Sequence, residues 1–129
     1  IRSNKIIDIK NNNSISLLGY DKAHKLQIRL MAKAIIEESK EELSDVWSKM
    51  YPMSRECYRV TEAPGKVVAS REEVLFEDKG DDKLNGFENF VIINCHIISI
   101  ETLFLHSSGH IRAKYIYENG VFNGEWLVP

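Results

Sequence analysis

In residues 26–36, LQIRLMAKAII, every second residue from Leu26 onward is apolar, and Gln27, Arg29 and Lys33 lie between them. Strict alternation of this kind predicts a β-strand with one buried face. A strand this long is more typical of a curved member of a barrel than of a short flat sheet. Its polar row suits an anionic, hydrogen-bonding ligand, and it equally suits the solvated side of any strand. The apolar face comprises Leu26, Ile28, Leu30, Ala32, Ala34 and Ile36, and the polar face comprises Gln27, Arg29, Met31 and Lys33.

The composition is that of a globular protein. The 129 residues are 43% hydrophobic and 28% charged, and the net charge is −2, which predicts one domain over residues 1–129. The near-neutral charge disfavours nucleic acid or an anionic membrane as a partner, and no apolar run approaches the roughly 20 residues of a membrane span. Cys57 and Cys95 lie in dissimilar settings without metal-ligand spacing, so we expect two reduced thiols in a cytoplasmic protein.

Two segments have helix signals. Residues 3–12 predict a short helix with Ser3 as its N-cap. Ser39 begins a second helix with a capping box, and Pro52 marks its end. Trp47 lies on an apolar stripe of this second helix, and we interpret it as a core residue.

Four further segments have strand signals. Residues 14–20 form a short apolar run that should pair antiparallel with 26–36 because the link is short. Residues 90–105 change apolar parity near 96–98, which predicts a bulge or bend, and Cys95 there is expected to be a buried structural thiol. Asn119-Gly120 predicts a two-residue hairpin turn between strands 110–117 and 121–128. The sum is a mainly β fold of five or six antiparallel strands, a small Greek-key-like barrel with two or three flanking helices.

The segment after Pro52 carries a candidate anion site. Arg55 and Arg59 are four residues apart, with Tyr51 and Tyr58 nearby, and two guanidinium groups and a phenol could bind a phosphate or carboxylate. The alternative is a surface helix in which the arginines pair with Glu56 and Glu62.

Residues 72–86 are charged and interrupted by glycine, so they predict an exposed loop. No apolar scaffold flanks the acidic residues of this loop. We therefore interpret Asp78, Asp81 and Asp82 as a solvated charge run rather than as a metal site.

A series of short motifs occurs in order along the chain. They are Ser3-Asn4-Lys5 with the following DIKNNNSISLL, Gln27, Tyr51-Pro52-Met53-Ser54-Arg55, His110-Ile111-Arg112, Tyr115, Glu118-Asn119 and Leu127-Val128-Pro129. Together they resemble pyridoxamine 5′-phosphate oxidase and its relatives, the FMN-binding split-barrel flavoproteins. The C-terminal motifs are the most specific, because they run in register with the family's ending without a gap.

The resemblance implies an FMN-dependent oxidoreductase with a small-molecule substrate, in which two subunits of a homodimer share each flavin site. Lys5 matches the lysine that holds the FMN phosphate, and Arg2 and Ser3 lie beside it. Gln27 matches the glutamine that hydrogen-bonds the flavin, and Arg112 matches the arginine near the ring. The implied substrate-binding residues are Tyr51, Arg55 and Arg59, around the substrate phosphate, and His110 in the substrate pocket.

Several positions depart from the family pattern. The arginine expected beside Lys5 is Asn4, the arginine two residues before His110 is Ser108, and the tryptophan expected around 103–104 is aliphatic or Phe. These departures favour a relative of the oxidase over the oxidase itself. The family's first strands would lie before Ile1, so we expect that further residues precede this chain. The alternatives are a non-catalytic barrel that binds a ligand or partner, and a barrel that uses deazaflavin or haem.

Overall fold

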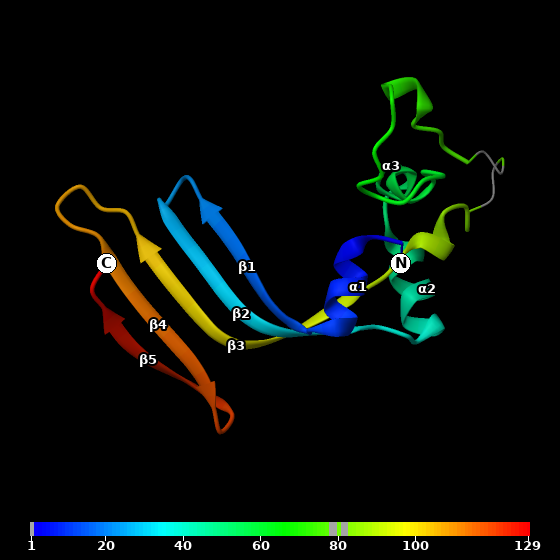
Figure 1. Ribbon diagram of the computed structural model, residues 1–129. Helices are drawn as coiled ribbons and strands as arrows, with labels where there is room; N and C mark the ends of the chain where they lie inside the picture. Colours follow the sequence, from blue (N-terminus) through cyan, green and yellow to red (C-terminus); the bar gives the residue numbers. More distant parts are fainter. Residues whose placement is uncertain (1, 78–79, 81–82) are drawn as a thin grey trace. The chain divides into compact units, whose positions relative to one another are not determined.

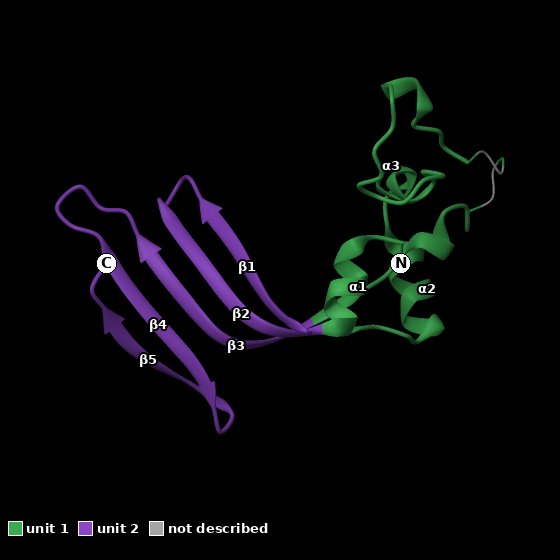
Figure 2. Ribbon diagram, viewed as in Figure 1, with its two compact units in different colours: residues 1–11, 36–94 green, residues 12–35, 95–129 purple. Residues whose placement is uncertain are grey.

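The computed structural model describes residues 2–77, 80 and 83–129. The chain divides into two compact units (Figure 2). Unit 1 comprises residues 1–11 and 36–94, and unit 2 comprises residues 12–35 and 95–129. The prediction of one domain over 1–129 stays a prediction, and each unit is described by itself below.

A five-stranded antiparallel sheet dominates unit 2, in which the strands follow one another in chain order (Figure 1). β1 pairs antiparallel with β2, β3 with β4, and β4 with β5. With the three α-helices found in the described part of the chain, this arrangement confirms the predicted mainly β, split-barrel class. The strands are β1 (Ser14–Asp21), β2 (Leu26–Ile36), β3 (Ile93–Phe104), β4 (Ile111–Glu118) and β5 (Val121–Leu127), and β3 begins in unit 1.

The alternation in residues 26–36 produces the predicted strand with the predicted bounds. Ala32 and Ala34 are 1% and 2% exposed, whereas Lys33 between them is exposed. The turn before β2 is held by Asp21, whose carboxylate accepts hydrogen bonds from the backbone N–H groups of Ala23 and His24. The short link and this turn fix the register of the β1–β2 hairpin.

The β4–β5 hairpin also forms as predicted. Asn119 and Gly120 both adopt positive φ, 52° and 84°, and Glu118 pairs with Val121 across the turn. Such a turn matches the twist of the flanking strands. Further along, Tyr115 lies opposite Gly124, and a Cβ at Gly124 would approach the tyrosine ring to 2.8 Å. The glycine therefore provides space for the aromatic ring on the sheet.

Three α-helices lie in unit 1: α1 (Asn4–Asn11), α2 (Lys40–Lys49) and α3 (Pro52–Arg55). The expected helix start at Ser39 is confirmed, because its side chain accepts a hydrogen bond from the backbone N–H of Glu42. Short 3₁₀ helices cover Glu56–Tyr58, Arg71–Glu73 and Phe87–Asn89. Ile6 and Ile9 on α1 are buried.

Trp47 on α2 forms the centre of the unit 1 core, as predicted. The side chain is 2% exposed, and its indole N–H donates to the Lys83 carbonyl at 2.9 Å. Its ring centroid lies 5.4–5.6 Å from those of three other aromatic rings, a spacing that favours edge-to-face and tilted contacts. These rings belong to Tyr58, Phe87 and Phe90.

The structure corrects one expectation for the segment 90–105. Cys95 was expected to be buried, and it is exposed. β3 runs over 12 residues, and Ile97 and Ile98 at the parity change are both exposed while Ser99 is buried. A strand can continue through a bulge or bend, so the irregularity expected near 96–98 stays a prediction. The apolar pattern indicated the faces of the strand, but what covers those faces depends on the tertiary arrangement. Asp78, Asp81 and Asp82 lie outside the described residues.

Within the described ranges, no helix combines the length and apolar character needed to cross a bilayer. The same ranges contain no group of three or more His, Cys, Asp or Glu side chains arranged to hold a metal ion.

Candidate functional site

A cavity of about 560 Å³ lies within unit 1. Its lining comes from three segments: the residues at the start of α1, residues between 57 and 74, and residues between 89 and 93. Apolar side chains such as Val60, Val68 and Val91 alternate there with charged ones. Three of the five predicted cofactor-binding residues, Arg2, Ser3 and Lys5, line this cavity.

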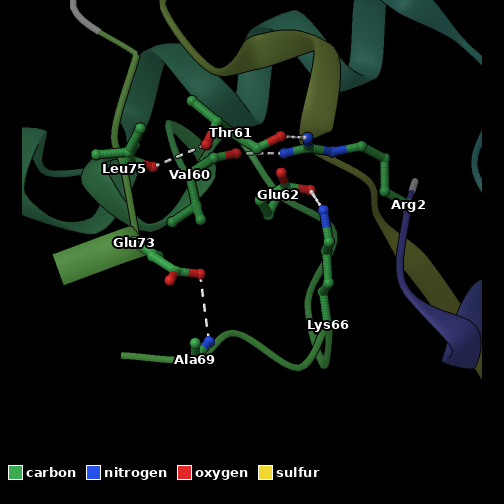
Figure 3. Close-up of polar contacts among 8 residues, drawn as sticks. All are labelled: Arg2, Val60, Thr61, Glu62, Lys66, Ala69, Glu73 and Leu75. Carbon is green, nitrogen blue, oxygen red and sulfur yellow. Dashed lines mark hydrogen bonds and ion pairs between the residues drawn. The ribbon is translucent and has the colours of Figure 1, made fainter. Parts of the chain in front are cut away.

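Arg2 connects the start of the chain to the cavity wall by hydrogen bonds (Figure 3). Its guanidinium donates one hydrogen bond to the Val60 carbonyl and another to the Thr61 carbonyl. Thr61 is itself fixed, because its backbone N–H and its hydroxyl both donate to the Leu75 carbonyl, at 3.0 and 3.2 Å. Both acceptors are neutral carbonyl groups, so these two hydrogen bonds do not compensate the positive charge that the guanidinium brings to the cavity.

The other charged groups of the cavity differ in how they are paired. Lys66 Nζ forms an ion pair with Glu62 at 2.8 Å, and Glu73 accepts a hydrogen bond from the Ala69 N–H at 3.2 Å (Figure 3). The side chain of Lys5, on the exposed side of α1, makes no hydrogen bond or ion pair to any described residue. Its ammonium is therefore a cation at the cavity that remains available for an anionic ligand.

Unit 2 gathers the other two predicted cofactor residues on one face of its sheet. Arg112 on β4 donates from Nε and Nη2 to Glu101 Oε1 on β3, at 3.2 and 2.7 Å. Arg29 on β2 lies 3.8 Å from the same carboxylate oxygen. Gln27 is two residues from Arg29, so it lies on the same face of the strand. This polar face, defined by Gln27, Arg29, Glu101 and Arg112, extends the polar row that the sequence predicted for residues 26–36.

The predicted substrate residues are not assembled around the cavity, because none of Tyr51, Arg55, Arg59 and His110 is among its lining residues. Tyr51 is 81% exposed, and His110 is exposed just before β4. Their role in substrate binding stays a prediction.

Arg55 and Arg59 are each engaged by the protein itself. Arg55 donates to the Ser48 carbonyl at 2.9 Å and lies over the Trp47 ring at 5.4 Å, which is a favourable cation–π position. Arg59 donates to the Glu77 carbonyl and to the Glu56 carboxylate, at 2.8 and 2.7 Å. The predicted pairing of Arg59 with Glu56 is thus confirmed.

The pairing predicted for Glu62 is wrong. Glu62 binds Lys66, which is four residues along the chain. Local sequence spacing favoured that lysine as much as it favoured an arginine.

Sequence reasoning missed Glu101 and most of the cavity wall. The signal for Glu101 was present, since it is the only charged residue in the stretch 97–105. The wall between 60 and 74 gave no comparable signal, because it is an irregular segment shaped by tertiary contacts such as the bridge between Val60 and Phe76.

Comparison with known proteins gave matches only at the level of structure. No family model matches the chain, and no curated protein matches it. A pyridoxamine 5′-phosphate oxidase-related, FMN-binding protein from Nostoc punctiforme superimposes with a TM-score of 0.73 at 16% identity, over 99% of this chain and 69% of that one. PhzG from Burkholderia lata, solved with tetrahydrophenazine-1-carboxylic acid, superimposes with a TM-score of 0.72 at 17% identity, over 99% of this chain and 65% of PhzG.

These similarities span nearly all of the chain and only about two thirds of each neighbour. Both neighbours are far more similar in structure than in sequence. The chain therefore has the fold of the pyridoxamine 5′-phosphate oxidase-like proteins.

Proposed function

We propose that this protein is an FMN-binding flavoprotein and an oxidoreductase of the pyridoxamine 5′-phosphate oxidase-like type. The observation that carries the proposal is the unpaired ammonium of Lys5 at the unit 1 cavity, beside Arg2 and Ser3. A phosphate dianion needs cationic and hydroxyl donors, and these three residues supply both. Lys5 is also the residue that the family resemblance assigns to the FMN phosphate.

The cavity has suitable dimensions and chemistry for part of such a ligand. Its volume of about 560 Å³ falls within the roughly 300–1,000 Å³ of small-molecule sites, which are mostly apolar with a few polar groups that fix orientation. Lys5 and Ser3 would bind the phosphate, and Arg2 would support the site through its bonds to the wall. The charges of Arg2, Lys5 and Lys66 exceed those of Glu62 and Glu73 by one, which favours an anion.

The polar face of unit 2 supports the same proposal. Gln27 offers an amide that both donates and accepts hydrogen bonds, and Arg112 offers a guanidinium, a combination suited to a ring edge with carbonyl and N–H groups. Bound FMN would supply the electron-transfer chemistry, so the protein needs to bind and orient it rather than provide a nucleophile or a paired acid and base.

The substrate is a small molecule in this proposal, and Tyr51, Arg55, Arg59 and His110 are its candidate contacts. Arg55 uses one guanidinium nitrogen on the Ser48 carbonyl. Because a guanidinium carries five N–H donors, Arg55 keeps donors for an anionic group.

We further propose that the protein acts as a homodimer. Large apolar side chains on the sheet of unit 2 are exposed, among them Leu18, Tyr117, Phe122 and Trp126. An apolar surface of this kind is typical of a protein–protein interface. Sedimentation should therefore give twice the mass of the chain.

The first test is the visible absorption spectrum of the purified protein, before and after addition of FMN and removal of the excess. Bands near roughly 370 and 450 nm, the flavin's own absorption tuned by the protein, are expected. Lys5→Ala should weaken FMN binding about ten- to hundredfold, since a hydrogen bond to a charged group contributes about 1.5–3 kcal/mol. Lys10→Ala is the matched control, because Lys10 is exposed on the same helix and does not line the cavity.

The alternative is a non-catalytic barrel that binds another ligand, or one that uses deazaflavin or haem. The carboxylates of Glu62 and Glu73 at the cavity favour this alternative, since they oppose a strongly anionic ligand. A spectrum that FMN does not change, with equal behaviour of Lys5→Ala and Lys10→Ala, would replace the flavin proposal with this one.

A further inference from the structure

Glu101 lies between two arginines that come from different strands. Its Oε1 accepts both Nε and Nη2 of Arg112, at 3.2 and 2.7 Å, and Arg29 Nη1 lies 3.8 Å from it. Its side chain is only 20% exposed, and that of Arg112 is 33% exposed. A partly buried pair with two donors on one carboxylate is better oriented than an exposed single-contact pair.

The strand register explains why this carboxylate reaches Arg112. Arg112 pairs with Leu103, and Glu101 is two residues from Leu103 on the same face of β3. The two side chains are therefore diagonal neighbours across adjacent strands, a distance that long side chains span. Because Nε and Nη2 are both engaged, the plane of the guanidinium is fixed.

We propose that Glu101 is a positioning residue, which holds the Arg112 guanidinium in the orientation in which it binds the flavin ring. This inference rests on the proposed function, since it takes Arg112 as a flavin ligand. Glu101 itself need not touch the cofactor. Its contribution is to remove the rotational freedom that Arg112 would otherwise lose on binding.

Two competing explanations make different predictions. If Glu101 only neutralises part of the positive charge of the polar face, its removal would free Arg112 and tighten binding of the anionic cofactor. If Glu101 only stabilises the sheet, its removal would affect FMN binding equally with and without Arg112. The two explanations are separable from positioning by a double-mutant cycle.

The experiment measures the FMN dissociation constant, by flavin fluorescence quenching, for the wild type, E101Q, R112Q and E101Q/R112Q. We expect E101Q to weaken binding about tenfold in the wild-type background, within the range of coupling between contacting residues. In the R112Q background the same change should have no further weakening effect. E101D, which keeps the carboxylate, should recover part of the lost affinity.

The matched control is E125Q. Glu125 lies opposite Lys114 in the β4–β5 register, so it shares the sheet face of Arg112, and it forms no hydrogen bond or ion pair with that residue. E125Q should bind FMN as the wild type does. Circular dichroism and thermal unfolding of each FMN-free variant establish that it is folded, and E101D provides the comparison if E101Q is not.

The outcomes separate this inference from the function on which it rests. A wild type that does not bind FMN overturns the proposed function and the positioning role together. A wild type that binds FMN leaves the function standing, and the positioning role is then overturned in any of three cases. In the first case, E101Q binds FMN with the same dissociation constant as E125Q. In the second, E101Q binds FMN more tightly than the wild type does. In the third, E101Q weakens FMN binding as much in the R112Q background as in the wild-type background.

Discussion

Among the described residues, unit 1 buries Trp47 and Phe90 almost completely, whereas the buried positions of the unit 2 strands are small, at Ala32, Ala34, Ala113 and Ser99. The aromatic cluster around Trp47 removes a large apolar area from water, and hydrophobic stabilisation scales with that area. The buried alanines of the sheet remove much less. Unit 2 therefore depends more on strand pairing, and it presents its large apolar side chains outward.

The comparison shows that the two units differ in where their large apolar side chains lie. Unit 1 contains its own aromatic core, and its cavity is bounded by its own residues. Unit 2 carries exposed apolar side chains over a sheet, together with the polar face of Gln27, Arg29, Glu101 and Arg112. Exposed apolar side chains on a sheet are typical of a surface that another molecule covers. This agrees with the proposed homodimer.

The largest expected effect is at the centre of the unit 1 core. Trp47→Ala should lower the free energy of unfolding by about 3–5 kcal/mol, because it leaves a cavity among three rings and an unpaired Lys83 carbonyl. Trp126→Ala is the matched variant in unit 2, where the side chain is 79% exposed. At concentrations where the chain is monomeric it should change stability by less than about 0.5 kcal/mol. Urea denaturation measures both, and similar losses would invalidate the comparison.

A medium effect is expected in the small-residue core of unit 2. Ala32→Leu should destabilise the protein by about 1–3 kcal/mol, because a position that is 1% exposed has no space for three more carbons. Ala23→Leu, in the exposed turn before β2, should be nearly neutral. If Ala32→Leu raised the midpoint of urea unfolding, unit 2 would be underpacked rather than closely packed around its alanines.

The smallest effect concerns two carboxylates at the start of α2. The negative charge of Glu37 raises the pKa of Glu42, while the Ser39 backbone N–H lowers the pKa of Glu37. Because the negative charge of Glu37 disfavours the ionised form of Glu42, Glu42→Gln should raise the melting temperature slightly at pH 7.

The gain from Glu42→Gln should shrink as the pH falls towards 4.5, the ordinary value for this group, because Glu42 of the wild type then becomes protonated. Glu37 behaves in the opposite way: its contribution to stability is present above its unfolded-state pKa and is lost as the pH falls through its lowered folded-state pKa. Melting curves from about pH 3 to 8, a range that extends well below the ordinary value of 4.5, check both signs. A gain that stayed constant over this range would show that charge repulsion from Glu37 is not its cause.

Local sequence patterns predicted much of this fold. Strict alternation was sufficient for β2, because the two faces of a strand differ at every step. Asn119-Gly120 specified the β4–β5 turn, since few residues adopt positive φ at low cost. Ser39 specified a helix start through a hydrogen bond within four residues. Each of these signals is local, and the physical cause lies inside the segment that carries it.

Only the tertiary structure decided which groups face one another. The exposure of Cys95, the position of Arg2 on the carbonyls of Val60 and Thr61, and the place of Glu101 between Arg29 and Arg112 all join segments far apart in the chain. Such contacts depend on register and on the path of irregular segments, which no periodic pattern encodes. The sequence by itself therefore determined the strands, the turns and the polar row, and the folded chain alone determined the cavity and the partners of its charges.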